Sequence, residues 1–187
     1  MNKLLGNEIK DYLLRDSERT GFRISHKTFS NEEISNCRIL YLSSFKEVIL
    51  LNVNFSEINF ESSFFKECVF KNCVFDEVSF SQTEFEDCKL INCQIKDCDL
   101  SNITFTKTVF DNSCFTRTET GSLTKAWFES CHFLETDFNG FNFLSVIQAA
   151  VVDSKFSKFD KSIQFNGEFF LFDILYSIKG INTMFIE

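Results

Sequence analysis

Cysteine and histidine are the side chains in this 187-residue sequence that could bind a metal, and their spacing argues against it. Zinc sites use closely spaced pairs such as C-x2-C, whereas most cysteines here recur at five-residue intervals and no C-x2-C pair occurs. The regularly spaced cysteines are Cys68, Cys73, Cys88, Cys93 and Cys98. We interpret them as small buried hydrophobic residues and predict no metal site. Cys114 falls outside this pattern and is the thiol we expect to be reactive.

Residues that could support catalysis are equally scarce. Neither of the two histidines, His26 and His132, has a recognisable nucleophile as its partner. The sequence also lacks the P-loop and the G-x-G-x-x-G pattern that bind nucleotide phosphates. We therefore predict that the protein is not an enzyme and uses no cofactor.

Charge and hydropathy restrict the partners. The chain has 19 basic and 27 acidic residues, a net charge of −8, which disfavours direct nucleic-acid binding and favours a basic protein partner. A hydrophobic content of 44% argues against intrinsic disorder. The most apolar stretch, residues 169–178, is shorter than the roughly 18 residues of a membrane-spanning helix, so no membrane is predicted. The N-terminus lacks the apolar run of a signal peptide, and a cytoplasmic location is expected.

The elements that must position these side chains follow a period of five residues. Every fifth residue from Leu40 to Phe115 is large and apolar, at sixteen positions in succession. In a chain with this hydrophobic content, such a run has a chance probability of roughly two in a million. We call the large residue of each unit the centre. Two places before most centres stands a small or β-branched inward residue, and the other three positions are mostly polar.

The repeat resembles the pentapeptide-repeat family, whose unit is a small residue, any residue, Leu or Phe, and two further residues. The units that begin at Cys68, Cys73 and Cys88 match this pattern. The resemblance implies an all-β solenoid, a right-handed quadrilateral β-helix in which four units form one coil of about twenty residues. Helical caps are expected at one or both ends, because a solenoid must cover its terminal coils.

The register slips twice along the chain. The centres Phe115 and Leu123 are eight residues apart, and so are Phe143 and Val151. The first slip coincides with a polar stretch that we interpret as a loop, with Arg117, Glu119 and Gly121 as its candidate contact residues. The predicted segments are a helical N-terminal cap at 1–20, an irregular lead-in at 21–37, regular coils at 38–117, the loop at 118–122, less regular coils at 123–166, and a C-terminal helix and tail at 167–187.

The predicted C-terminal helix is apolar on almost every side. A cap requires one apolar face, so the excess suggests a dimer interface, and a deep cap covered by the chain's own tail is the alternative. Several members of the family dimerise through this end, which the resemblance also implies here. The candidate interface residues are Phe169, Phe170, Phe172, Leu175 and Tyr176.

Stacked coils place every twentieth residue in one column. Two columns, two places after their centres, are acidic: Glu47, Glu67 and Asp87, and Glu57, Glu77 and Asp97. They form either an ordinary solvated surface or a negative stripe that fits a basic groove built for DNA. A third column contains Asn52, Asn72, Asn92 and Asn112, which either pair along the axis or serve the turn.

One flank is unusually apolar for outward positions, and the loop, the N-terminal segment or a partner could cover it. Its residues are Ile49, Leu51, Val69, Ile91 and Val109.

Two functional hypotheses remain. The resemblance includes Qnr-type quinolone-resistance proteins and immunity proteins of toxin producers, which implies a DNA-mimicking binder of DNA gyrase or topoisomerase IV that gives quinolone or toxin resistance. The features shared with that branch are Phe-rich centres, Cys at the inward position, a loop, net acidity and an apolar C-terminal segment. The alternative is a general protein interaction scaffold or a secreted effector module.

Overall fold

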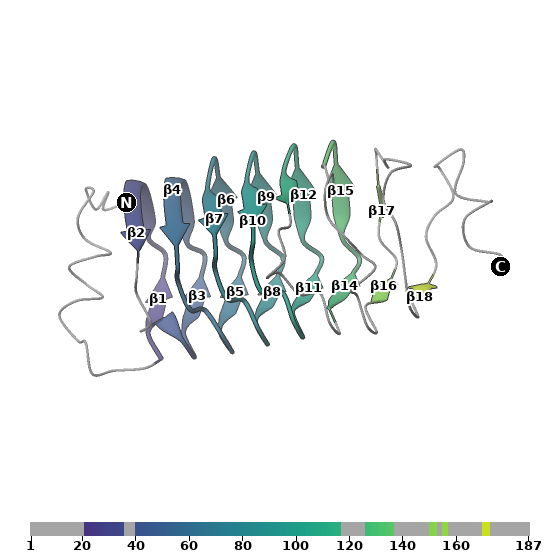
Figure 1. The fold of residues 1–187 in the computed structure, drawn as a ribbon, viewed down its shortest axis with the longest axis horizontal. Coiled ribbons are helices and arrows are strands. Elements are labelled where there is room, and N and C mark those ends of the chain that lie inside the picture. Colours follow the sequence, from purple (N-terminus) through teal and green to yellow (C-terminus); the bar gives the residue numbers. More distant parts are fainter. Residues whose placement is uncertain are drawn as a thin grey trace.

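The protein is an all-β solenoid whose coils stack along one axis (Figure 1). The computed structural model describes residues 21–35, 40–116 and 126–136, and the backbone of strands at 150–152, 155–156 and 170–172. All strand pairs in these ranges are parallel, and neighbours in a pair belong to successive coils. In the described part of the chain no helix is long and apolar enough to cross a membrane.

Each coil has four sides, which we number in chain order. The first side is an eight-stranded sheet. Its strands, in spatial order, are β1 (Arg23–Ser25), β3 (Ser44–Lys46), β5 (Phe64–Lys66), β8 (Glu84–Glu86), β11 (Thr104–Thr106), β14 (Trp127–Glu129), β16 (Ala150–Val152) and β18 (Phe170–Phe172).

The second and third sides share a ten-stranded sheet, because β2 (Thr28–Ser35) and β4 (Ile49–Ser56) continue around the corner between them. The second side continues with β6 (Val69–Lys71), β9 (Lys89–Ile91), β12 (Val109–Asp111), β15 (His132–Leu134) and β17 (Lys155–Phe156). The third side continues with β7 (Val74–Asp76), β10 (Gln94–Lys96) and β13 (Cys114–Thr116). The fourth side has isolated bridges that join Asn59, Ser79 and Asp99.

The centres of the units point inward and stack. On the first side Phe45, Phe65, Phe85 and Phe105 follow one another with ring centroids 4.6 to 4.8 Å apart. Across a corner, rings meet edge to face, as do Phe60 and Phe65 at 5.3 Å. Both arrangements are favourable for aromatic quadrupoles. The predicted centres from Leu40 to Phe115 are all buried, which confirms the period of five as the source of the core.

The lead-in predicted at 21–37 is wrong for residues 21–35, because they form β1 and β2 and pair with the next coil. Two features hide this coil in the sequence. Its offset to the next coil is 21 residues, as in the pair Phe29 and Leu50. Its inward positions also hold residues that are not small, including Phe22 and Glu32, both of which are buried.

The helix predicted at the C-terminus is wrong where the structure describes it, since Phe170–Phe172 form strand β18. Leu171 pairs with Val151, twenty residues earlier, so the segment keeps the stacking distance of the solenoid and satisfies the backbone edge of β16. The predicted N-terminal cap lies outside the described residues.

The two register slips are real. Offsets are 20 residues between most coils, but Phe105 pairs with Phe128, and Phe128 with Val151, each 23 residues on. An eight-residue step is one five-residue unit plus three residues, and these three residues account for the difference between an offset of 23 and the usual offset of 20. The backbone of the predicted centres Phe128, Phe133, Val151 and Phe156 therefore pairs in register with the coil before.

Candidate partner-binding surfaces

The residue two places after each centre determines where the outward side chains of a corner lie. We call it the corner residue. All nineteen non-glycine residues with positive φ in the described ranges occupy this position, with φ between 45° and 59°. This left-handed conformation turns the chain into the next side. The N–H of a corner residue also bonds across to the next coil, as Glu47 N donates to Lys66 O at 2.9 Å. The corner residues therefore form straight columns.

The first acidic column, Glu47, Glu67 and Asp87, lies between the first and second sides and is partly neutralised. The Glu47 carboxylate lies 2.8 Å from His26 Nδ1 and 3.5 Å from Lys46 Nζ. Beside the column, Lys66 Nζ donates to Glu86 Oε1 at 2.7 Å. This hydrogen bond, with smaller contributions from Glu67 and Asp87, raises the pKa of Lys66 above its ordinary value.

The second acidic column, Glu57, Glu77 and Asp97, lies diagonally opposite, between the third and fourth sides, and is more negative. In the same three coils the adjoining sides add Asp76, Glu61 and Asp99, which makes six carboxylates against one lysine, Lys96. Lys96 Nζ bonds Asp76 at 3.1 Å, and this bond raises the pKa of Lys96. In sum the second acidic column and its surroundings carry an excess of five negative charges (six minus one).

The column between these two, at the corner of the second and third sides, is a ladder of asparagines. Each amide donates to the oxygen of the one in the preceding coil, from Asn112 through to Asn31, at distances of 2.8 to 3.1 Å. The same residues hold the left-handed corner conformation. Both explanations open to the sequence, axial pairing and turn chemistry, therefore operate together. Asn31 belongs to the coil that sequence reasoning missed.

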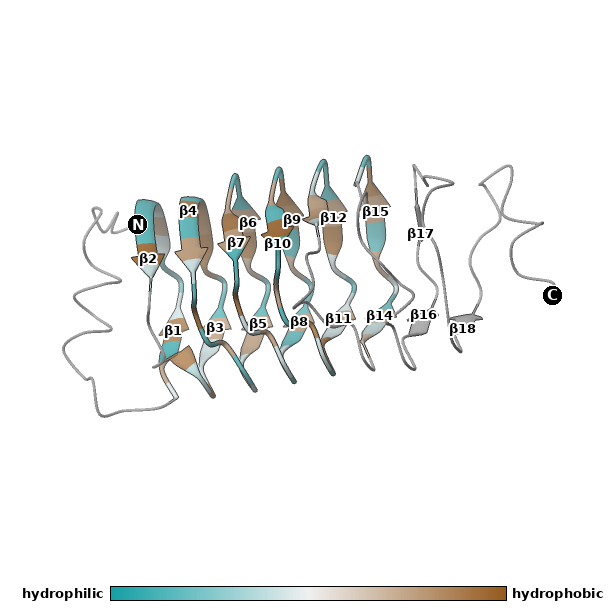
Figure 2. Cartoon of the chain, in the orientation of Figure 1, coloured by the Kyte–Doolittle hydropathy of each residue, from teal (hydrophilic) through white to brown (hydrophobic). Residues whose placement is uncertain are grey.

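The apolar flank lies on the second side, where two outward columns run along the rod. One contains Thr28, Ile49, Val69, Lys89, Val109 and His132, and the other Ser30, Leu51, Lys71, Ile91, Asp111 and Leu134. The five predicted flank residues are half-buried by their neighbours in the sheet. Leu134 is 40% exposed and extends the flank. Leu134 follows the centre Phe133 directly, as Leu51 follows Leu50, and this position in the sequence could have identified it as a flank residue. Figure 2 shows the alternation of hydrophobic and hydrophilic residues along successive coils.

The remaining candidate residues cannot be joined to these surfaces. Arg117, Glu119 and Gly121 of the predicted loop lie outside the described residues, and so do Phe169, Leu175 and Tyr176 of the predicted dimer interface. Phe170 and Phe172 belong to β18, whose backbone alone is described. The loop contacts and the C-terminal dimer stay predictions.

The cysteines at inward positions are buried, as the spacing predicts. Their thiols donate to carbonyls of the preceding coil, as Cys68 Sγ does to Phe45 O at 3.4 Å. Burial raises the pKa of Cys98 to about 12, so this thiol is not a nucleophile at neutral pH. Cys114 is half-buried at its outward position. In the residues that the structure describes, no group of three or more metal-binding side chains comes together.

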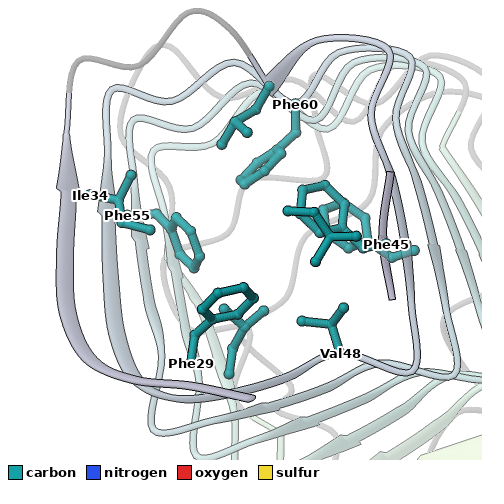
Figure 3. A pocket seen from close by; sticks show the side chains of 10 residues that line it. Phe29, Ile34, Phe45, Val48, Phe55 and Phe60 are labelled. Carbon is teal, nitrogen blue, oxygen red and sulfur yellow. The ribbon is translucent and has the colours of Figure 1, made fainter. Parts of the chain in front are cut away.

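The interior offers no room for a substrate in its described part. Two core cavities measure about 10 Å³ each, and Figure 3 shows one of them, into which Phe29, Phe45, Phe55 and Phe60 point. That volume is at the lower limit for one water molecule and far below the several hundred Å³ of a ligand pocket.

The comparison with protein families agrees with this geometry. The family model of the pentapeptide repeat region matches residues 38–115. These residues contain the unbroken run of inward centres and left-handed corners described above. Residues 38–115 are a pentapeptide repeat region.

Among solved structures, full-length QnrB1, a plasmid-mediated fluoroquinolone resistance protein, is similar to this chain. The TM-score is 0.43 and the identity 16%, over 82% of this chain and 86% of QnrB1. HetL, a pentapeptide-repeat protein involved in heterocyst differentiation regulation from Nostoc sp. strain PCC 7120, gives a TM-score of 0.33 and 10% identity over 83% and 81% of the two chains. Rfr23, a pentapeptide-repeat protein from the cyanobacterium Cyanothece 51142, gives a TM-score of 0.28 and 15% identity, over 71% of this chain and 92% of Rfr23. No curated protein matches the sequence.

Proposed function

We propose that this protein is a non-enzymatic DNA mimic that occupies the basic DNA-binding groove of a type II topoisomerase, DNA gyrase or topoisomerase IV. Binding there would give resistance to quinolones or to a toxin that acts on the enzyme. The cytoplasmic location expected from the sequence fits such a target.

The observation that carries the proposal is the pair of acidic columns at diagonal corners of a straight rod. Successive coils are about 4.8 Å apart, so each column presents one carboxylate per coil, and the two together present one per about 2.4 Å over three coils. Duplex DNA presents one phosphate charge per about 1.7 Å, also as two lines on one rod. A groove that is built to attract DNA therefore attracts this rod by the same long-range field.

The second acidic column is the one we expect to matter more. It adjoins three further carboxylates, and one lysine, Lys96, lies beside it. Charges that are less neutralised within the rod remain available to a partner, and their attraction is screened by salt over about 10 Å at 0.1 M. The complex should therefore weaken as salt is raised.

The test measures supercoiling by gyrase and decatenation by topoisomerase IV with the purified full chain, with and without a fluoroquinolone. QnrB1 is a fluoroquinolone resistance protein, which makes this drug class the appropriate choice. We expect micromolar protein to inhibit the enzyme or to raise the drug concentration needed for inhibition. The variant E57Q/E77Q/D97N should lose at least about tenfold of this effect, because three charges of the rod are removed. Gln82 and the corner asparagines show that amides fit corner positions.

The matched control is E33Q/E84Q/E129Q, which changes the net charge by the same amount but leaves both acidic columns intact. Its effect on the enzymes should equal that of the parent. Equal losses in both variants would show that net charge alone acts, and no effect of the parent on either enzyme would reject the proposal in favour of a scaffold for another partner.

A further inference from the structure

The second side presents two kinds of side chain that a solitary rod leaves exposed. One kind is apolar: Ile49, Leu51, Val69, Ile91, Val109 and Leu134, which we call the apolar face. The other is charged: Lys71, Lys89 and Asp111 on the same side, with Lys107 at its corner. Within the described ranges none of these four forms a salt bridge. Apolar and charged residues alternate along the column of Ile91, and in the other column Lys89 lies between Val69 and Val109, so a partner must match both patterns.

We propose that the apolar face binds a second copy of this chain, with the two rods antiparallel about a twofold axis that passes beside Ile91. A twofold axis that lies in the contact plane and runs across the rod reverses the order of the coils and places each column opposite itself. The proposal concerns a different surface from the second acidic column and does not depend on the proposed function.

This operation pairs the apolar residues with one another except for Ile49, which meets His132. Ile91 lies on the axis and meets its own copy. Val69, one coil before it, meets Val109, one coil after it. Leu51, two coils before, meets Leu134, two coils after.

The same operation pairs opposite charges. Lys71 meets Asp111 in the column of Ile91, and the symmetry makes this pair twice. At the neighbouring corner Glu67 meets Lys107, again twice. Asp87 and Lys89 lie in the coil of the axis, so each faces its own copy, and each aspartate is also diagonal to the lysine of the other copy. Charge complementarity of this kind fixes orientation and register.

Other arrangements lose these matches. An axis moved half a coil toward the N-terminus sets Lys71 against Ile91 and Leu51 against Asp111. An axis parallel to the rods sets Lys89 against Ile91 and Val109 against Asp111. Both place an ionised side chain on an apolar one, which costs desolvation without a compensating partner.

The size of the face determines the strength of the dimer. Six coils at about 4.8 Å, and five residues per side at up to about 3.3 Å, give at most roughly 480 Å² per copy. Stable interfaces bury about 800 Å² per partner. We therefore expect a reversible dimer that is mostly dissociated at low micromolar protein and forms at several hundred micromolar.

Sedimentation equilibrium of the full chain between about 5 µM and 1 mM tests this, with charge exchange as the control for register. K71E sets glutamate against Asp111, and D111K sets lysine against Lys71, so each should weaken association at least tenfold. K71E/D111K restores both pairs, and its association constant should be within about threefold of that of the parent. Three results would each overturn the proposal. The parent could be monomeric at every concentration, or the double variant could associate as weakly as the single variants. The single variants could also associate as strongly as the parent, which is the result expected of a dimer through the C-terminal end.

A cross-link tests the axis itself. In a C114S background, I91C should form an intermolecular disulfide under mild oxidation at least ten times faster than V74C. Val74 is also a half-buried outward strand residue, but it lies on the third side. Equal rates for the two variants would overturn the placement of the axis.

Discussion

At the residue scale, the corner position is where this chain departs most from ordinary backbone preference. The left-handed conformation costs a residue with a Cβ roughly 1–2 kcal/mol, and Asn tolerates it better than most. Yet the corner residues that adopt this conformation also include Glu, Asp, Lys and even Leu42, which is 49% exposed. Backbone hydrogen bonds from each corner to the next coil offset this cost, so the corner side chain is free to vary with what it must bind.

The asparagine ladder separates these two contributions. Asn72→Gly keeps the conformation and removes two ladder hydrogen bonds, whereas Asn72→Ala removes the bonds and adds the conformational penalty. We expect the alanine variant to be less stable than the glycine variant by about 1 kcal/mol. Urea unfolding of both variants at equal m-value measures this difference. Equal stabilities would show that the penalty at this corner is relieved in another way.

At the element scale, the period of five predicted the strands from 44 to 116 because every centre obeys it. The first coil escaped prediction, since Phe22, Lys27 and Glu32 stand where small residues are expected. The C-terminal run failed for the opposite reason: a continuous apolar segment fits a helix and a strand equally well by pattern, and only its distance of twenty residues from Val151 distinguishes them. The acidic columns followed from the same arithmetic as the core. Their contacts with His26 and the lysines did not, because these contacts depend on side-chain reach.

The three extra residues between Phe105 and Phe128 provide a prediction for the loop. Deletion of residues 119–121 returns that offset to twenty, and the unfolding temperature should stay within a few degrees of the parent because loop length affects stability weakly. Deletion of residues 80–82, three residues inside a regular coil, should abolish the cooperative unfolding transition, since it shifts every inward residue that follows. Circular dichroism with temperature measures both. Similar losses in the two deletions would contradict this account of the slip.

At the scale of the whole molecule, the dimer covers one of the two acidic columns and leaves the other exposed. The antiparallel dimer covers the second side and the first acidic column, and the second acidic column is at the diagonally opposite corner. A dimer would therefore present two strongly negative edges, one on each copy, directed away from each other. A topoisomerase groove could receive either edge.

Self-repulsion along the rod gives a salt effect on folding that has the opposite sign to the effect on binding. We expect the free energy of unfolding to rise by about 0.5–1 kcal/mol between roughly 0.02 and 0.5 M sodium chloride, because screening relieves repulsion between stacked carboxylates. The variant E57Q/E77Q/D97N should show a smaller rise than E33Q/E84Q/E129Q. Urea titrations at the two salt concentrations test this, and equal rises in the two variants would show that the column contributes no net repulsion.

The constant offset of twenty residues also affects how such a molecule can change over generations. Residues 64–83 form one complete coil, and their removal would bring Ser44–Lys46 against Glu84–Glu86, with Phe45 stacked on Phe85 as it now stacks on Phe65. Every backbone donor would still meet an equivalent acceptor. A gene for this protein can therefore lengthen or shorten the rod in steps of about sixty nucleotides, each worth about 4.8 Å. A lineage can in this way adjust the rod to the length of a groove without inventing a new contact.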